Sequence, residues 1–338
     1  MRRVPVAVVA VILVAGVLIG RSSAQAPAGA AAAANIVRIS KYVYSVVSTE
    51  TSAAFYQGVF EIPLANNATA LPMAQPIPDL VQKLTSVAAP ATFRAAHFTI
   101  PGAADGFDFE QTEFIGPVRP AHQPRLQDPG ASWVVFHVRD LDAAMVRIPK
   151  FGGTIISTGG RPVGNNGQRA IFAQDPNGGF LEIIQPATLP AGTTFVIASP
   201  RLAFVVADAE KAGAVYRDHF GLTVKMPGAW NDDQRMSGLP GLPGSKVRSA
   251  TVTLPGKTLS WQFYEYGNID RTPYTRHVPD PGAGGVAIEV RDIAAFLETV
   301  KASGGSVVSV GGKPVEGRNI AFARDANGVL LEVIQVAK

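Results

Sequence analysis

The chain has 338 residues and no cysteine. Disulfides, cysteine-ligated metal sites and lipid attachment through an N-terminal cysteine are therefore excluded, and packing must supply the stability. Charged residues are few, at 17%, and no basic run alternates with aromatic residues, so we expect no nucleic-acid partner. The sequence also lacks a nucleophile elbow, a Walker loop and a dinucleotide fingerprint. These absences leave a packed globular protein without a common nucleotide or serine-hydrolase motif.

The N-terminus has the pattern of a secretory signal peptide. Two arginines at positions 2 and 3 precede an apolar run from 4 to 20, and the small residues Ser22 and Ala24 follow. This pattern predicts cleavage after Ala24, which places the mature protein in the periplasm or outside the cell. The alternative is a retained membrane anchor, because 17 apolar residues are slightly short of a full span.

Removal of residues 1–24 would take away three arginines and no acids, which lowers the formal net charge from +4 to +1. Residues 25–35, "QAPAGAAAAAN", are predicted to be a flexible leader. Apart from the anchor alternative we expect no membrane partner, and the sequence does not specify the oligomeric state.

The rest of the chain repeats itself. The segment "DPGASWVVFHVRDLDAAM" from Asp128 matches "DPGAGGVAIEVRDIAAFL" from Asp280, and "FAQDPNGGFLEIIQ" matches "FARDANGVLLEVIQ" near the C-terminus. Upstream, "KYVYSVVSTETSAAFYQGVF" from Lys41 matches "RLAFVVADAEKAGAVYRDHF" from Arg201. Each quarter shows an alternating strand, a helix and short strands separated by glycine-rich turns. The pattern predicts four β-α-β-β-β modules in an α+β protein.

This pattern resembles the vicinal oxygen chelate superfamily, which includes glyoxalase I, extradiol dioxygenases and bleomycin-binding proteins. The matching segments are "VRDLDAA", "VRDIAAF", "VVADAEKAGAVYRDHFGL", "DPNGGFLEIIQ" and "DANGVLLEVIQ". The resemblance implies that two modules close into an eight-stranded cup. We therefore expect two tandem cup domains, residues 36–192 and 198–338.

Members of this family hold a divalent metal in the cup, with ligands on the first and last strands of each module. The resemblance places the last-strand positions at Glu110, Glu182, Gln262 and Glu332. It places the first-strand positions at Lys41, Trp133, Arg201 and Gly285, and none of these is a usual metal ligand. We therefore expect no metal cofactor, with Lys41 paired to Glu110 or Glu182, and Arg201 paired to Glu332.

Alternation along the strands adds His137 and Glu289 to the residues that face the cups. The first cup would be lined by Lys41, Glu110, Trp133, His137 and Glu182, and the second by Arg201, Gln262, Glu289 and Glu332. Trp133 can be an aromatic wall for a ligand or simply core. His137 can be a buried, hydrogen-bonded histidine or, with Glu110 and Glu182, part of a displaced metal site.

The favoured function is metal-independent binding of a small, largely apolar molecule by an exported protein, as in the drug-binding members of the family. The alternative is a metal-dependent lyase, isomerase or dioxygenase with a displaced site. A third interpretation is a scaffold whose cups are filled by their own side chains. The residues leave these three alternatives open.

Overall fold

The computed structural model describes residues 28–101, 103, 107–116, 124–198, 200–255, 260–275 and 277–337. The predicted signal peptide, residues 1–24, lies outside these ranges. Most of the leader expected to be flexible is instead helix α1, Ala28–Asn35. Alanine, the strongest helix former, dominates this segment, and the side-chain oxygen of Asn35 accepts a hydrogen bond from the backbone of Asp292 at 2.7 Å. None of the helices within the described ranges is both long and apolar enough to cross a membrane.

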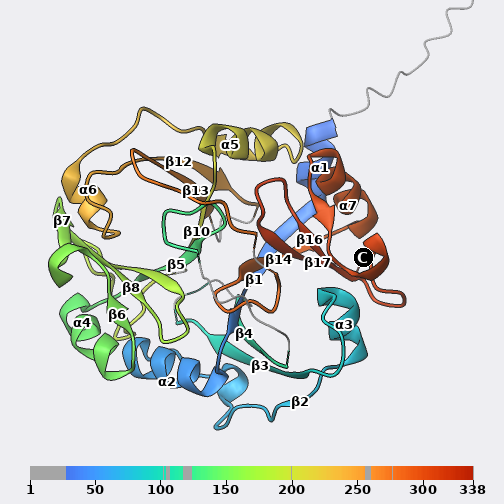
Figure 1. Ribbon diagram of the computed structural model, residues 1–338, viewed down its shortest axis with the longest axis horizontal. Coiled ribbons are helices and arrows are strands. Elements are labelled where there is room, and N and C mark those ends of the chain that lie inside the picture. Colours follow the sequence, from blue (N-terminus) through green and yellow to red (C-terminus); the bar gives the residue numbers. More distant parts are fainter. Residues whose placement is uncertain are drawn as a thin grey trace, which may run out of the picture.

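The strands form two large sheets with helices around them (Figure 1). The first module supplies β1 (Ile36–Val46), β2 (Gln75–Pro76), β3 (Thr92–Thr99) and β4 (Asp108–Ile115), and the second supplies β5 (Ser132–His137), β6 (Thr154–Ile155), β7 (Val163–Asn165), β8 (Gln168–Gln174) and β9 (Phe180–Gln185). The third supplies β10 (Arg201–Val205), β11 (Thr223–Lys225), β12 (Lys246–Thr253) and β13 (Ser260–Gly267), and the fourth supplies β14 (Gly284–Val290), β15 (Ser306–Val307), β16 (Ile320–Arg324) and β17 (Leu330–Gln335). The predicted α+β fold with four β-α-β-β-β modules is confirmed.

The modules do not pair in the expected order. Sheet A has the order β15-β16-β17-β14-β1-β4-β3-β2, and sheet B has the order β11-β12-β13-β10-β5-β9-β8-β6, with β7 beside β8. The first module therefore shares a sheet with the fourth, where Ile39 lies opposite Ile288. The second shares a sheet with the third, where Leu202 lies opposite Val134. The expectation that consecutive modules form one cup is wrong.

The reason lies in the similarity of the modules. Each module offers a first strand as a free edge, so the repeat alone does not decide which two edges meet. The chain leaves sheet A between Ile115 and Ser132 and returns to it between Gly267 and Gly284. These two crossings interleave the halves, so that neither predicted domain contains a complete sheet.

The long helices follow the repeat closely. They are α2 (Thr49–Phe60), α4 (Leu141–Lys150), α5 (Ala209–Asp218) and α7 (Ile293–Ala302), and two shorter helices are α3 (Asp79–Thr85) and α6 (Gln234–Gly238). The aspartates of the repeated "VRD" and "VAD" motifs are N-caps, and Asp292, for example, accepts a hydrogen bond from Ala295 at 3.0 Å. Glycines also follow two of the helices, since Gly152 and Gly304 come after α4 and α7 with φ of +83° and +93°.

The largest apolar cluster packs between the sheets and these helices. Within it, the hydroxyl of Tyr56 donates to Asp175 at 2.9 Å, and that of Tyr216 donates to Asp325 at 2.6 Å. Both aspartates begin Asn-Gly turns, between β8 and β9 and between β16 and β17. Burial raises the pKa of Asp175 to about 6 despite the hydrogen bonds that it accepts. Each turn is thereby bound to a helix of the preceding module.

Candidate functional site

Cup A, as we call the concave face of sheet A, brings three charged side chains together. Lys41 comes from β1, Glu110 from β4 and Glu332 from β17. The Nζ atom of Lys41 lies 2.6 Å from an oxygen of Glu110 and 3.1 Å from an oxygen of Glu332. The three side chains are 17%, 12% and 10% exposed. One ammonium group therefore forms ion pairs with two largely buried carboxylates.

The electrostatics of this triad favour a permanent charge on the lysine. Burial alone would lower the pKa of Lys41, but attraction by Glu332 and Glu110 outweighs burial and raises it. Burial also raises the pKa of Glu332, and the attraction of Lys41 offsets only part of that effect while Glu110 adds repulsion. Lys41 is therefore charged at neutral pH, and the two carboxylates share its charge.

A histidine and a further acid lie at the edge of the same group. His97 on β3 is opposite Glu110 in the sheet register, and its Nδ1 lies 2.7 Å from Oδ2 of Asp108. The hydrogen bond to Asp108 raises the pKa of His97, burial lowers it, and the charge of Glu110 raises it further. Ligand atoms of His97, Asp108 and Glu110 all lie within 4.8 Å of one another. Neither His97 nor Asp108 could be singled out from the sequence, because the strand register that joins them is set by tertiary pairing.

A cavity of about 90 Å³ lies in cup A beside the charged triad. Its walls are mostly apolar and come from β1, α3, β3, β4 and β16, namely Val43, Val81, Leu84, Phe93, Phe114 and Phe322. Helix α3 covers one side, since Leu84 packs in the same cluster as Phe322. Cup A therefore joins an apolar space to a neutralised pair of carboxylates.

Cup B, the concave face of sheet B, is filled by its own side chains. Trp133 is 1% exposed, and its ring centroid lies 4.8 Å from that of Tyr264 and 5.3 Å from that of Phe172. Leu239, which follows α6, belongs to the same buried cluster. Of the two alternatives for Trp133, the packing supports core.

Glu182 of cup B is held by an indole and a more distant guanidinium. Trp133 Nε1 donates to Oε2 of Glu182 at 3.3 Å. Burial raises the pKa of Glu182, whereas the charge of Arg201 and the bond from Trp133 oppose this. Burial and the charge of Arg201 lower the pKa of His137 to about 4. Gln262 accepts a hydrogen bond from Tyr264 at 3.0 Å, so its amide oxygen already has a partner.

The structure regroups the predicted site residues. Lys41, Glu110, Glu289 and Glu332 lie on sheet A, whereas Trp133, His137, Glu182, Arg201 and Gln262 lie on sheet B. The expected Lys41–Glu110 pair is present, but the expected partners Glu182 for Lys41 and Glu332 for Arg201 are wrong, because consecutive modules belong to different sheets. The displaced metal site that combined His137 with Glu110 and Glu182 is divided between the sheets for the same reason.

Glu289 has a partner of its own. It forms a two-point ion pair with Arg38 at 2.8 and 2.9 Å across β1 and β14. Arg38 is 38% exposed and Glu289 is 15% exposed. This pair therefore lies toward solvent and stays apart from the Lys41 triad.

The first-strand positions do not fit the metal that the family resemblance implies. In cup A one is Lys41, already bound to both last-strand glutamates, and the other is Gly285, where a Cβ atom would come within 2.9 Å of the backbone oxygen of Leu330. In cup B they are the indole of Trp133 and the guanidinium of Arg201. Neither ammonium, guanidinium nor indole nitrogen donates a lone pair to a metal ion. The first-strand residues of each cup therefore favour pairing with the nearby carboxylates over binding a metal ion.

Comparison with known proteins agrees with the fold. The model of the Glyoxalase/Bleomycin resistance protein/Dioxygenase superfamily matches residues 199–333, the third and fourth modules. Among curated proteins, none matches the chain.

Two solved structures cover most of the chain. Glyoxalase I from Zea mays has a TM-score of 0.54 and 20% identity, over 88% of this chain and 92% of that chain. A candidate dioxygenase from Bacillus subtilis has a TM-score of 0.54 and 15% identity, over 89% and 86%. At these identities the likeness concerns the fold alone.

Proposed function

We propose that the chain, whose residues 199–333 match the model of the glyoxalase superfamily, binds a small, largely apolar molecule in cup A without the family's metal. The observation that carries this proposal is the position of Lys41 between Glu110 and Glu332. A divalent ion about 4 Å from an ammonium group would be repelled by roughly 8 kcal/mol at an effective dielectric of 20. Lys41 therefore supplies a positive charge to both carboxylates.

The size of the cavity limits the ligand. An apolar cavity of about 150 Å³ accommodates benzene, so the roughly 90 Å³ of cup A suits a smaller group such as a branched alkyl chain. Cup B contributes no comparable space at Trp133 and Tyr264, which contact each other. We therefore place the binding site in cup A and interpret cup B as a scaffold that is filled by its own side chains.

A neutral probe with an isobutyl group, 3-methylbutanamide, tests the proposal in ligand-observed NMR titrations. Val43 lines the cavity, so we expect Val43→Leu to weaken binding and Val43→Phe to abolish it, because added side-chain atoms fill the space. The same two substitutions at Val47, which is 50% exposed just after the same strand, serve as controls and should leave binding unchanged. Equal binding by the wild type and the folded Val43→Phe variant would contradict the proposal.

A second candidate function rests on His97, Asp108 and Glu110. One imidazole and two carboxylates are a plausible set for a divalent metal, which is the basis for a metal-dependent lyase, isomerase or dioxygenase. Titration with Zn²⁺ and Mn²⁺, followed by elemental analysis, separates the two functions. Metal-independent binding predicts no stoichiometric metal in the wild type and a gain in Lys41→Gln. The metal enzyme predicts stoichiometric metal that is lost in His97→Ala.

We further propose that the protein is exported, which the arginines and apolar run of residues 1–24 support. Mass spectrometry of the protein recovered from outside the cytoplasm tests this. A mature chain that begins at Gln25 is expected, and an intact Met1 on a membrane-bound chain would favour the anchor.

A further inference from the structure

Four polar side chains line the otherwise apolar cavity of cup A, and they decide which chemical groups the cavity can receive. They are the carboxylates of Glu110 and Glu332 and the hydroxyls of Thr85 and Thr112. An ionised carboxylate only accepts hydrogen bonds, whereas a hydroxyl group can donate one hydrogen bond and accept others. The character of the lining therefore depends on where the two threonine hydroxyls direct their hydrogens.

Both hydroxyl hydrogens are already used within the protein. The hydroxyl of Ser45 donates to the carbonyl of Val278 at 2.6 Å, so in its contact with Thr112 at 3.1 Å the threonine must be the donor. The hydroxyl of Thr85 donates to the carbonyl of Val81 at 2.7 Å. Each threonine oxygen keeps lone pairs but has no hydrogen left to donate. The polar side chains of the lining therefore present acceptors to a ligand.

Glu332 offers an acceptor atom that the protein leaves unused. The residue is 8% exposed. The Nζ atom of Lys41 lies 3.1 Å from Oε2 of Glu332, but its hydrogen bond is donated to Glu110, at 2.6 Å. Oε2 is buried and accepts no hydrogen bond from the residues that the structure describes. A buried acceptor without a donor is unfavourable, so a donor on a molecule in the cavity would stabilise the site.

The charges of the triad favour a donor that is also a cation. One ammonium group stands against two carboxylates, so with both carboxylates ionised one negative charge is left over. Burial raises the pKa of Glu332, the charge of Lys41 opposes this, and the charge of Glu110 adds to it. A second positive group beside Oε2 would favour the ionised form of Glu332, as Lys41 does. A monovalent cation that carries N–H groups therefore complements both the charge and the acceptors.

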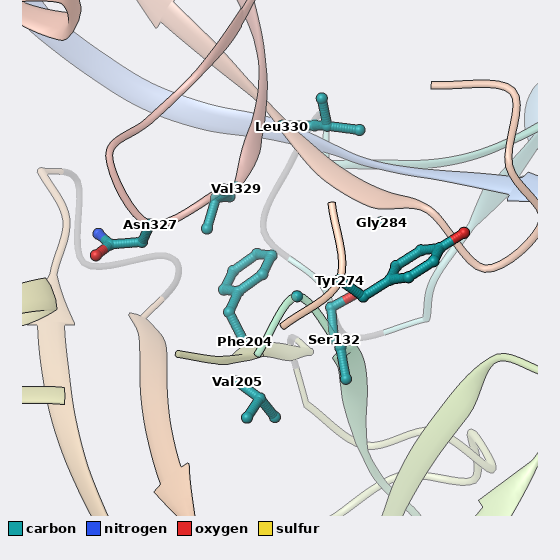
Figure 2. A pocket seen from close by; sticks show the side chains of 11 residues that line it. Ser132, Phe204, Val205, Tyr274, Gly284, Asn327, Val329 and Leu330 are labelled. Carbon is teal, nitrogen blue, oxygen red and sulfur yellow. The ribbon is translucent and has the colours of Figure 1, made fainter. Parts of the chain in front are cut away.

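The space around the triad is suited to a short alkyl chain. Thr85 and Val278 line both the cavity and a larger hollow of about 730 Å³, so a molecule whose end occupies the cavity has room for its remainder. Figure 2 shows Ser132, Phe204 and Tyr274 around a different hollow, which measures about 20 Å³. That volume is room for about one water molecule. The alkyl chain is therefore placed in the cavity beside Glu332.

We propose that the molecule taken up by cup A is a small aliphatic amine, whose ammonium group binds Glu332 and Thr112 while its alkyl chain lies against the apolar wall. This proposal rests on the proposed function of cup A. An ammonium group has three donors and no acceptor, so it matches a lining whose polar side chains accept. Its hydrogen bonds to a carboxylate are charge-assisted and therefore strong.

The test compares 3-methylbutan-1-amine with 3-methylbutan-1-ol in ligand-observed NMR titrations of the mature full-length protein at pH 7. The two probes share one carbon skeleton, and the amine is protonated at this pH, as a lysine side chain is. The wild type is expected to bind the amine about ten-fold more tightly than the alcohol. A third probe, 3-methylbutanoate, offers only acceptors and is expected to bind more weakly than the alcohol. These measurements on the wild type do not depend on the folding of any variant.

Two matched substitutions locate the preference for the amine. Glu332→Gln removes the charge of the carboxylate and nearly keeps its volume, while Lys41 keeps its hydrogen bond to Glu110. We expect this variant to bind the amine and the alcohol equally. Glu182→Gln makes the same change on the last strand of the second module in cup B, where Trp133 is the partner, and should leave the ten-fold preference intact.

The outcomes separate this proposal from the function on which it rests. Binding of 3-methylbutanamide and the alcohol without a preference for the amine would overturn the ammonium site alone. A preference that persists in Glu332→Gln would overturn it as well, because another acidic group would then be responsible. Amine binding that survives in Val43→Phe would place the amine outside the cavity and overturn the proposal too. Failure of the amine, the alcohol and the amide to bind would overturn the proposed function of cup A.

Discussion

In cup A a lysine lies between two glutamates beside an apolar cavity, whereas in cup B an indole binds a single glutamate within packed aromatic rings. The two cups have the same strand pairing, so the scaffold does not explain the difference. Cup A places Lys41 where cup B places Arg201, and Val43 where cup B places Ala203. The small Ala203 lies opposite Trp133 across β10 and β5, so the space released by a small residue is taken by a large one.

The two cups neutralise their buried carboxylates in different ways. Buried carboxylates need a positive partner or hydrogen-bond donors, and both cups meet that need with side chains of the protein. Cup A does so with the compact ammonium group of Lys41 and retains a cavity of about 90 Å³. Cup B does so with the ring of Trp133, which packs against Tyr264, and we therefore place the proposed binding site in cup A.

Removal of the cation should harm cup A more than cup B. Lys41→Met leaves Glu110 and Glu332 without a counter-charge, and we expect a loss of about 3–5 kcal/mol of unfolding free energy at pH 7. Arg201→Met should cost about 1–2 kcal/mol, because Glu182 keeps its bond from Trp133. Urea denaturation measures both. The loss in Lys41→Met should shrink as pH falls, because burial raises the pKa of Glu332 and favours its neutral form. Equal losses in the two variants would contradict the comparison.

Substitutions that add side-chain volume should destabilise cup B more than cup A. Ala203→Val in cup B introduces methyl groups against Trp133, and overpacking of this kind costs about 1–3 kcal/mol. Val43→Leu in cup A extends into the cavity and should change stability by less than about 1 kcal/mol. Thermal unfolding of the two variants measures the difference. A larger loss for Val43→Leu would mean that the cavity of cup A is closed to added atoms.

The sequence predicted the modules but not their partners. The N-cap aspartates, the glycine stops and the strand alternation are local features, so Lys41, Glu110 and Glu332 were correctly placed on cup-facing positions. Which glutamate meets Lys41 depends on which edges pair, and four similar modules leave that undetermined. The sequence therefore suggested Glu182 where the structure places Glu332.

The candidate site also includes a residue that carries no local signal in the sequence. His97 could not be recognised, because its position opposite Glu110 depends on the register of β3 and β4.

The smallest predicted difference concerns the histidines of the two cups. The pKa of His97 is raised, so its contribution to stability is present below pH 6.5 and is lost as pH rises through the folded-state pKa. The pKa of His137 is lowered to about 4, so its contribution is present above pH 6.5 and is lost as pH falls toward 4. Both side chains are partly exposed, so each effect should be about 1 kcal/mol or less.

NMR titration of the imidazole C–H signals, assigned with His97→Gln and His137→Gln, measures the two pKa values directly. We expect the pKa of His97 above 6.5, because Asp108 binds its imidazole, and that of His137 near 4, because burial and then the charge of Arg201 lower it. Lys41→Met should raise the midpoint of His97 further, since it removes a positive neighbour, and should leave His137 unchanged. A change in the pKa of both histidines in Lys41→Met would show that the two cups are electrostatically coupled. A wild-type pKa of His97 below that of His137 would contradict the electrostatic difference between the cups.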